Sequence, residues 1–302
     1  MQTISVGTMV RSKTCTPEYI KSLIPYGFEC FALFWWQNFN DAGPDKLLKP
    51  VQDALKGSNA FISTLTPFGN PMEYDELAEI ARKNLYTAID YAEAYNTDLV
   101  TAFTGRVRGK SIPDNIERFK EVWAPLAEYA AKKKVRLAFE NCPMSGDWNN
   151  GDWNIAFNPD CWELMFEAVP AENVGLQWEP CHQMGQMIDP MPQIRKWGHK
   201  FFNIHGKDAT VRHDIIRKHG TKGKEIIAWH RFPGFGDSNW TDIISELRLV
   251  GYKGTIDIEG WHDPIYRDDW EMTGQVHSLN YLKQCRGGEF IANPVKSALT
   301  WN

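Results

Sequence analysis

The chain has 302 residues, of which 43% are hydrophobic and 24% are charged, and it carries a formal net charge of −5 with a pI near 5.9. This composition can fill a sizeable core and is not that of a disordered chain. The acidic balance argues against a nucleic-acid partner, because such a surface needs clustered cations.

Cysteine spacing and the first residues bear on the compartment. The six cysteines form no C-x-x-C pair, and in a chain of this length they fit reduced thiols. The opening MQTISVGTMVRSK lacks the basic-then-apolar layout of a signal peptide, and no apolar run approaches the ~18 residues that span a bilayer. We therefore expect a cytoplasmic protein with no membrane partner.

Strand-like and helix-like segments alternate along the whole chain. Short apolar runs predict strands at 4–10, 30–35, 61–67, 99–105, 135–140, 174–179, 201–205 and 254–259. Apolar residues at three- and four-residue spacing predict helices at 16–27, 45–57, 72–96, 114–134, 159–168, 190–198, 239–252 and 268–285.

Eight strands that are each followed by a helix predict a parallel sheet closed into a barrel. Parallel strands need crossover helices, and this chain supplies them in order without a break in composition. The expected fold is one α/β domain over residues 1–302, a single (β/α)8 TIM barrel. We expect the tail, about 288–302, to pack against the barrel or a partner chain, and a homo-oligomer.

Ionisable side chains stand where four consecutive strands are expected to end. Glu140, Glu179, His205 and Glu259 occupy these positions, and the C-terminal strand ends of such a barrel share one bowl where chemistry takes place. Three carboxylates held together repel one another unless a cation lies among them. The four residues are therefore candidate ligands of one divalent metal ion. The oxygen-rich set favours Mn²⁺ or Mg²⁺, with Co²⁺ or Zn²⁺ as alternatives.

Several motifs in the second half of the chain resemble a known family. The segments AFENCP, WEPCH, FNIHGKDA, RFPGFGD and GYKGTIDIEG are similar, in order and spacing, to those of the xylose-isomerase-like superfamily of sugar isomerases and epimerases. The resemblance implies that Glu140, Glu179, His205 and Glu259 bind the metal, and that Glu140 and Glu259 also act as acid and base. It further implies that His182 contacts the substrate.

One position departs from the family pattern. Many members have Asp where this chain has Glu179, and the extra methylene moves the carboxylate by about 1.5 Å. The longer side chain either still binds the metal or reaches past it toward His182.

The expected reaction is proton abstraction next to a carbonyl on a ketose or keto-sugar, through an enediolate, giving isomerisation or epimerisation. Lys207 is a candidate for binding a substrate oxygen, with an ion pair to Asp208 as its structural alternative. Arg231 is a candidate for binding an anionic or hydroxyl-rich part of the substrate, or a strut of its loop.

The 13 tryptophans add a hypothesis about the ligand. Trp35 and Trp148 stand with other tryptophans near strand ends or in the stretch 141–157, where their rings would stack on a sugar; ordinary core packing is the alternative. The Gly- and Asn-rich stretch itself has the composition of a lid or a subunit contact.

Three other functions follow from the same motifs. A metal-dependent lyase or dehydratase, or a glycoside-cleaving enzyme acting by β-elimination, would use the same site. A non-catalytic sugar-binding subunit is more remote. A DNA endonuclease of this superfamily would need further histidines after the third and fourth strands. This chain has TPFGN and TAFTG there, with no histidine in either, which argues against that function. Of the remaining histidines, His213, His219, His230 and His262 are expected at the surface or bracing loops, with a place on the rim of the bowl as the alternative.

Overall fold

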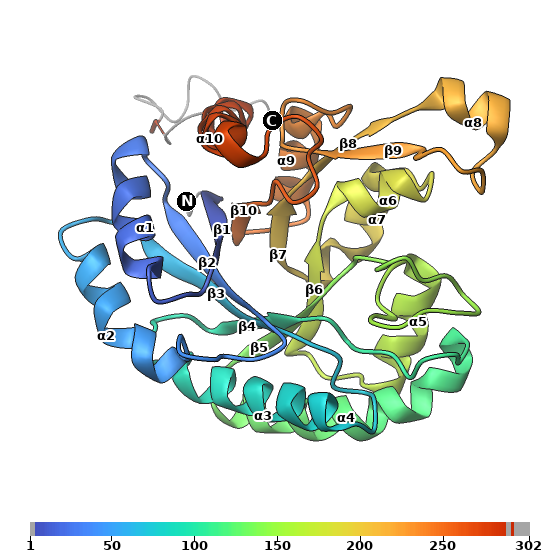
Figure 1. Cartoon of the computed structure of the whole chain (residues 1–302), viewed down its shortest axis with the longest axis horizontal. Helices are drawn as coiled ribbons and strands as arrows, with labels where there is room; N and C mark the ends of the chain where they lie inside the picture. Colours follow the sequence, from blue (N-terminus) through green and yellow to red (C-terminus); the bar gives the residue numbers. More distant parts are fainter. Residues whose placement is uncertain (1–3, 288–290, 293–302) are drawn as a thin grey trace, which may run out of the picture.

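The computed structural model describes residues 4–287 and 291–292, and in it eight parallel strands close into a barrel with helices around it (Figure 1). The strands follow one another around the barrel in the order β1-β10-β7-β6-β5-β4-β3-β2. Their bounds are β1 Ser5–Arg11, β2 Cys30–Trp36, β3 Phe61–Phe68, β4 Leu99–Ala102, β5 Arg136–Glu140, β6 Val174–Trp178, β7 Phe201–Gly206 and β10 Thr255–Ile258. The predicted (β/α)8 barrel is confirmed.

Most of the helices begin where the sequence offers a cap or a proline. Asp75, Ser111, Asn158 and Asn239 each accept a hydrogen bond from a backbone N–H of the first turn that follows. The helices are α1 Thr16–Leu23, α2 Pro44–Leu55, α3 Glu76–Tyr91, α4 Ile112–Lys132, α5 Pro159–Ala168, α6 Pro180–Gly185, α7 Pro190–Trp197, α8 His213–His219, α9 Trp240–Leu249 and α10 Glu271–Arg286, with 3-10 turns at Ile24–Tyr26, Gly198–Lys200 and Asp268–Trp270.

Besides the short helix α6, one larger part of the molecule was not predicted as regular structure. Strands β8 (Asp208–Val211) and β9 (Ala228–Arg231) form an antiparallel pair outside the barrel, joined through α8, and this arm stands off to one side (Figure 1). Both strands have four residues, and α8 has no buried residue. Elements this short, without an apolar face, carry little periodic signal.

The interior of the barrel is polar below its mouth. Asp257 of β10 accepts hydrogen bonds from Asn203 (2.7 Å), Thr255 (3.0 Å) and Ser63 (3.0 Å). β3 and β10 are not neighbours in the sheet, so the bond from Ser63 to Asp257 crosses the interior. Asp257 therefore points inward, and strand alternation sends Glu259, two residues later, to the same side.

Two expectations can be compared with only part of the chain. The expected packing of the tail, about 288–302, lies outside the described residues apart from 291 and 292. Within the described ranges, none of the helices combines the length and apolar character required to cross a membrane.

The two ends of the described chain are joined by an ion pair. Arg286, at the end of α10, donates to both carboxylate oxygens of Glu29 at 2.6 and 2.9 Å and to the carbonyl of Ile4 at 2.7 Å. Burial alone would raise the pKa of Glu29, but the bonds from Arg286 and from the Val6 amide outweigh it and lower that pKa. The pair fastens the last helix to the first strands.

Replacing Gly7 by Ala tests the tightness of the barrel interior. A Cβ on Gly7 would overlap the backbone carbonyl of Cys30 on β2, which cannot move without shifting a strand. We expect Gly7→Ala to lower the free energy of unfolding by about 1–3 kcal/mol in urea titration. The control is Gly185→Ala, whose Cβ would lie 3.9 Å from that of Ala228. Equal stability of the two variants would contradict the packing described.

Replacing Glu29 by Gln tests the ion pair through its pH dependence. A carboxylate with a lowered pKa stabilises the fold fully above its unfolded pKa and loses that contribution as the pH falls through its folded pKa. At pH 7 the variant should be less stable than the parent by about 1–3 kcal/mol. That difference should shrink on acidification below about pH 4.5. A difference independent of pH between 3 and 7 would exclude the charge as its cause.

Candidate active site at the barrel mouth

Four ionisable side chains meet at the C-terminal ends of β5, β6, β7 and β10. One ligand atom each of Glu140, Glu179, His205 and Glu259 lies within 4.8 Å of all the others. Nδ1 of His205 is 3.0 Å from Oε2 of Glu259, 3.7 Å from Oε2 of Glu179 and 4.0 Å from Oε2 of Glu140. The structure thus brings together the four residues that were predicted from their positions at the strand ends.

Side-chain amides fix the backbone beside two of these groups. Asn141 accepts from the amide of Glu179 at 2.8 Å and donates to its carbonyl at 3.0 Å, which ties the end of β5 to the end of β6. Asn154 donates to the carbonyls of Glu140 and Cys142 at 2.8 and 2.7 Å. The stretch 141–157, expected as a lid or subunit contact, is therefore anchored directly behind Glu140.

Lys207 belongs to the cluster. Its Nζ lies 2.6 Å from Oε1 of Glu259 and 3.9 Å from Oε1 of Glu179, and its side chain is buried. The alternative pairing with Asp208 does not form, because Asp208 points the other way and accepts from the indole of Trp240 and the amide of Ser238. Successive residues of an extended chain face opposite sides, which explains the difference.

Burial and charge move the pKa values of the cluster in opposite directions. Burial raises the pKa of Glu140 to about 8. Burial would raise the pKa of Glu259 too, but Lys207 and His205 outweigh it and hold that pKa at about 2. His182 and Lys207 likewise hold the pKa of Glu179 well below its usual range. Burial opposes the charge on His205, yet Glu179 and Glu259 raise its pKa to about 10.

The donor set fits a divalent cation. Among the described residues, both carboxylate oxygens of Glu179, both ring nitrogens of His205 and Oε2 of Glu259 are buried and make no well-oriented hydrogen bond, although His205 lies 3.0 Å from Glu259 and His182 lies 2.6 Å from Glu179. Buried charged groups normally have partners, because desolvation without compensation costs several kcal/mol. A cation among the carboxylates would satisfy these atoms, and three carboxylates with one imidazole suit Mn²⁺ or Mg²⁺.

Two further predicted residues lie beside the cluster or near it. Nε2 of His182 lies 2.6 Å from Oε1 of Glu179, so Glu179 faces the candidate metal position with one oxygen and His182 with the other. Arg231, on β9, has its Nε 3.1 Å from Oδ2 of Asp263 in the loop after β10. Arg231 is thus a strut between the arm and that loop in this structure.

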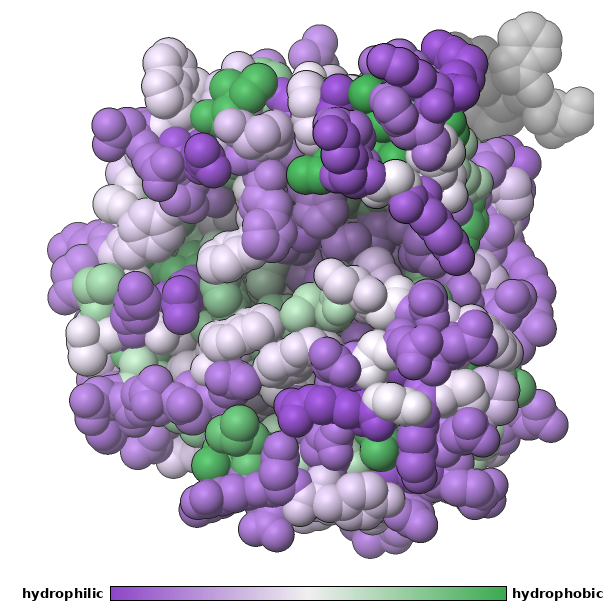
Figure 2. Space-filling model, turned by 45° about the vertical axis from the view of Figure 1, so that its right-hand side comes forward, coloured by the Kyte–Doolittle hydropathy of each residue, from purple (hydrophilic) through white to green (hydrophobic). Residues whose placement is uncertain are grey.

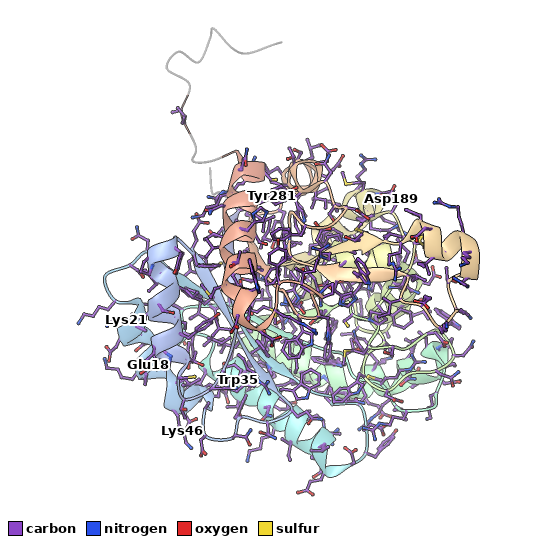
Figure 3. The ribbon with its side chains drawn as sticks, turned by 45° about the horizontal axis from the view of Figure 1, so that its top comes forward. Glu18, Lys21, Trp35, Lys46, Asp189 and Tyr281 are labelled. Carbon is purple, nitrogen blue, oxygen red and sulfur yellow. The ribbon has the colours of Figure 1, made fainter. Side chains whose placement is uncertain are left out.

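The two predicted tryptophans do not join the cluster. Trp35 is 2% exposed, donates its indole N–H to the carbonyl of Ala42 and packs edge-on against Phe39, on the side of the barrel that α1 and α2 cover (Figure 3). Trp148 is 37% exposed, and its carbonyl accepts from the amide of Ile112 at the start of α4. The core-packing alternative therefore describes Trp35.

One histidine for which a surface or loop position was favoured lies at the site instead. His213 and His219 are exposed as expected, but the ring of His230 lies 5.1 Å from that of His182 and 5.7 Å from that of His262. Burial lowers the pKa of His230 to about 3. The position of His230 depends on the pairing of β8 with β9, and the sequence has no apolar pattern that predicts this pairing.

A second missed feature is apolar. Phe68 and Phe103, at or next to the ends of β3 and β4, are buried together with Cys142, and Trp153 packs against them. In Figure 2 the side that carries the arm is turned forward. The surface there has a recess, with hydrophilic residues deep in it and paler, less hydrophilic residues along one side.

Comparisons with known proteins agree with this architecture. No curated protein matches the sequence, whereas the model of a family described as xylose isomerase-like TIM barrel matches residues 21–285. Among solved structures, 3-keto-D-glucoside 4-epimerase YcjR from E. coli has 12% identity and a TM-score of 0.70, over 93% of this chain and 100% of that one.

Two other epimerases have a similar backbone. L-ribulose 3-epimerase has 15% identity and a TM-score of 0.68, over 94% of this chain and 96% of that one. D-psicose 3-epimerase has 15% identity and a TM-score of 0.66, over 94% of this chain and 100% of the other. At such identities the likeness shows a common fold. Because the family match extends over most of its length, the chain belongs to the xylose isomerase-like TIM barrel family.

Proposed function

We propose that this protein is a divalent-metal-dependent sugar isomerase or epimerase that abstracts a proton next to the carbonyl of a ketose or keto-sugar. The observation that carries the proposal is the buried cluster of Glu140, Glu179, His205 and Glu259, with ligand atoms within 4.8 Å of one another. Structural neighbours described as 3-keto-D-glucoside 4-epimerase, L-ribulose 3-epimerase and D-psicose 3-epimerase support it.

The four residues of the cluster would hold the metal ion, Mn²⁺ or Mg²⁺ by the chemistry of the donors. A divalent cation supplies Lewis acidity that polarises a carbonyl and makes the neighbouring C–H more acidic. The protein's own contribution is to keep three carboxylates in one buried place, which Asn141, Asn154 and Lys207 do through the contacts described above.

Glu140 and Glu259 are suited to opposite parts of a proton transfer. Lys207 and His205 keep Glu259 ionised, so its carboxylate is the candidate base that takes the proton from carbon. Glu140 is buried without a cationic partner closer than His205 at 4.0 Å, and without a metal ion burial raises its pKa to about 8, so of the two carboxyls it is the candidate acid that returns a proton to the substrate. Paired carboxyls with separated pKa values are a common arrangement for acid and base.

Two flanking residues would orient the sugar. His182 is 5% exposed beside Glu179, where its ring can meet a substrate hydroxyl. Lys207, beside Glu259, can meet a second oxygen of the substrate once one of its three N–H groups is turned from the carboxylate. Arg231 would extend this set if a ligand displaces it from Asp263.

Metal analysis tests the ligand set. The wild-type protein should bind about one Mn²⁺ per chain, and Glu179→Gln or His205→Asn should weaken binding at least about 100-fold, since changing only the residues that hydrogen-bond to metal ligands already costs about 10–100-fold. The measurement is a Mn²⁺ titration followed by elemental analysis. Glu163→Gln, at an exposed position of α5, is the matched control. Unchanged Mn²⁺ affinity in both ligand variants would rule out this metal site.

Solvent exchange tests the reaction. D-psicose, L-ribulose and a keto-glucoside are incubated with the Mn²⁺-loaded protein in heavy water, and the recovered sugars are examined by NMR. We expect one deuterium at the carbon next to the carbonyl, at a rate lowered about 10²–10⁴-fold in Glu140→Gln and in Glu259→Gln.

The same experiment separates the alternative chemistry. Release of water or of an aglycone would assign the lyase, dehydratase or glycoside-cleaving alternative, because elimination expels a group after the same proton abstraction. Turnover without solvent deuterium in any product would overturn proton abstraction itself.

A further inference from the structure

The mouth of the barrel is divided into two chemically different halves. β5, β6, β7 and β10 contribute the charged cluster. The inward residues at the ends of β2, β3 and β4 are aromatic, and a tryptophan of the loop after β5 joins them. We call Phe34, Trp36, Phe68, Phe103 and Trp153 the aromatic wall.

The aromatic wall is a continuous packed surface. The rings of Phe68 and Phe103 are stacked at 4.5 Å, and Trp36 lies 6.3 Å from each of them and 5.4 Å from Trp153. Phe68 and Phe103 are buried, whereas Trp36 is 39% exposed and Phe34 is half-buried. The buried rings thus form the backing, and Trp36 with Phe34 presents an open face.

The wall reaches the candidate catalytic groups through one residue. Cys142 packs with Phe68 and Phe103, and its Sγ lies within 4.8 Å of a carboxylate oxygen of Glu140 and of a ring nitrogen of His182. A molecule that places its reacting carbon beside Glu140 therefore has its next substituent within reach of the wall.

The wall's composition selects the kind of substituent. Its members offer only indole N–H groups as conventional hydrogen-bond donors and no acceptor of comparable strength. A second sugar ring buried there would leave hydroxyls without partners, which is costly, whereas a planar apolar ring would gain stacking and burial. The pale residues along one side of the recess in Figure 2 agree with a boundary that is less hydrophilic than its depth.

We propose that the substrate is a keto-glycoside whose aglycone is an aromatic ring, with the sugar at the charged cluster and the ring on the aromatic wall. This inference rests on the proposed function for the sugar end alone. The wall makes Trp36 a specificity residue, which contacts the aglycone and leaves proton transfer to Glu140 and Glu259.

Three keto-glycosides that share one oxidised glucose unit test the proposal. Their aglycones are methyl, phenyl and a second glucose, and their dissociation constants are measured by calorimetry on the Mn²⁺-loaded protein. We expect the phenyl compound to bind at least about tenfold more tightly than the methyl compound, and the glucosyl compound to show no such gain.

Variants then locate the effect. Trp36→Ala should bring the phenyl-to-methyl ratio to within about threefold by weakening phenyl binding more than methyl binding, and Trp36→Phe should restore most of the ratio. Trp229→Ala is the matched control, since Trp229 is 37% exposed on β9 beneath Arg212. A ratio near one in the wild type, a ratio that survives Trp36→Ala, or a glucosyl compound that binds best would overturn the proposal.

Three further outcomes are informative. If Trp36→Ala changes the mass of the particle in sedimentation but not the ratio, the wall is a contact between chains and the proposal fails. If the methyl compound exchanges deuterium while phenyl confers no gain, the proposed function stands and the aglycone assignment falls. If no compound exchanges deuterium but the phenyl preference depends on Trp36, the wall stands and the proposed reaction falls.

Discussion

Mutual repulsion of three buried carboxylates is the constraint on which this structure depends. Two unit charges about 4 Å apart interact by about 4 kcal/mol at an effective dielectric constant of 20, so three such groups cannot share a site unaided. Without a cation the fold balances them with Lys207, His205 and a proton on Glu140. The clamp from Asn141 to Glu179 and the polar interior below the site hold the groups in place.

The closed barrel gives the mouth its asymmetry. Each strand delivers one side chain to the rim, so chemistry can be divided between strands without changing the fold. Here charge comes from one arc of neighbouring strands and aromatic surface from the other, and Cys142 lies at their junction. A site built this way can bind a molecule by its apolar end while it reacts at its polar end.

Much of this arrangement was predictable from residues. The eight strands were identified because buried parallel strands are apolar runs between helical segments, and the four cluster residues because an ionisable group directly after such a run is conspicuous. Trp35 and Trp36 show the limit. Both are apolar and adjacent, so the sequence alone does not say which one faces the helices and which one faces the mouth.

Other features depend on pairings that leave no local signature. Lys207 was a candidate for a substrate oxygen or for an ion pair with Asp208, and its pair with Glu259 follows only from the side to which the strand end directs it. His230 reaches His182 because β9 pairs with β8, and two four-residue strands separated by a polar helix carry no periodicity from which that pairing follows. Such contacts depend on tertiary structure and not on local sequence.

The arm formed by β8, α8 and β9 bonds its strands to each other and stays outside the barrel ladder. An arm of this kind can be lengthened, shortened or exchanged without shifting the register of any strand of the barrel. The arm places His230 beside His182. Replacing the arm would therefore change the side chains next to the candidate metal ligands and leave those ligands in place. Related proteins that share this barrel can therefore differ in the one insertion between β7 and α9 and keep the same candidate metal ligands.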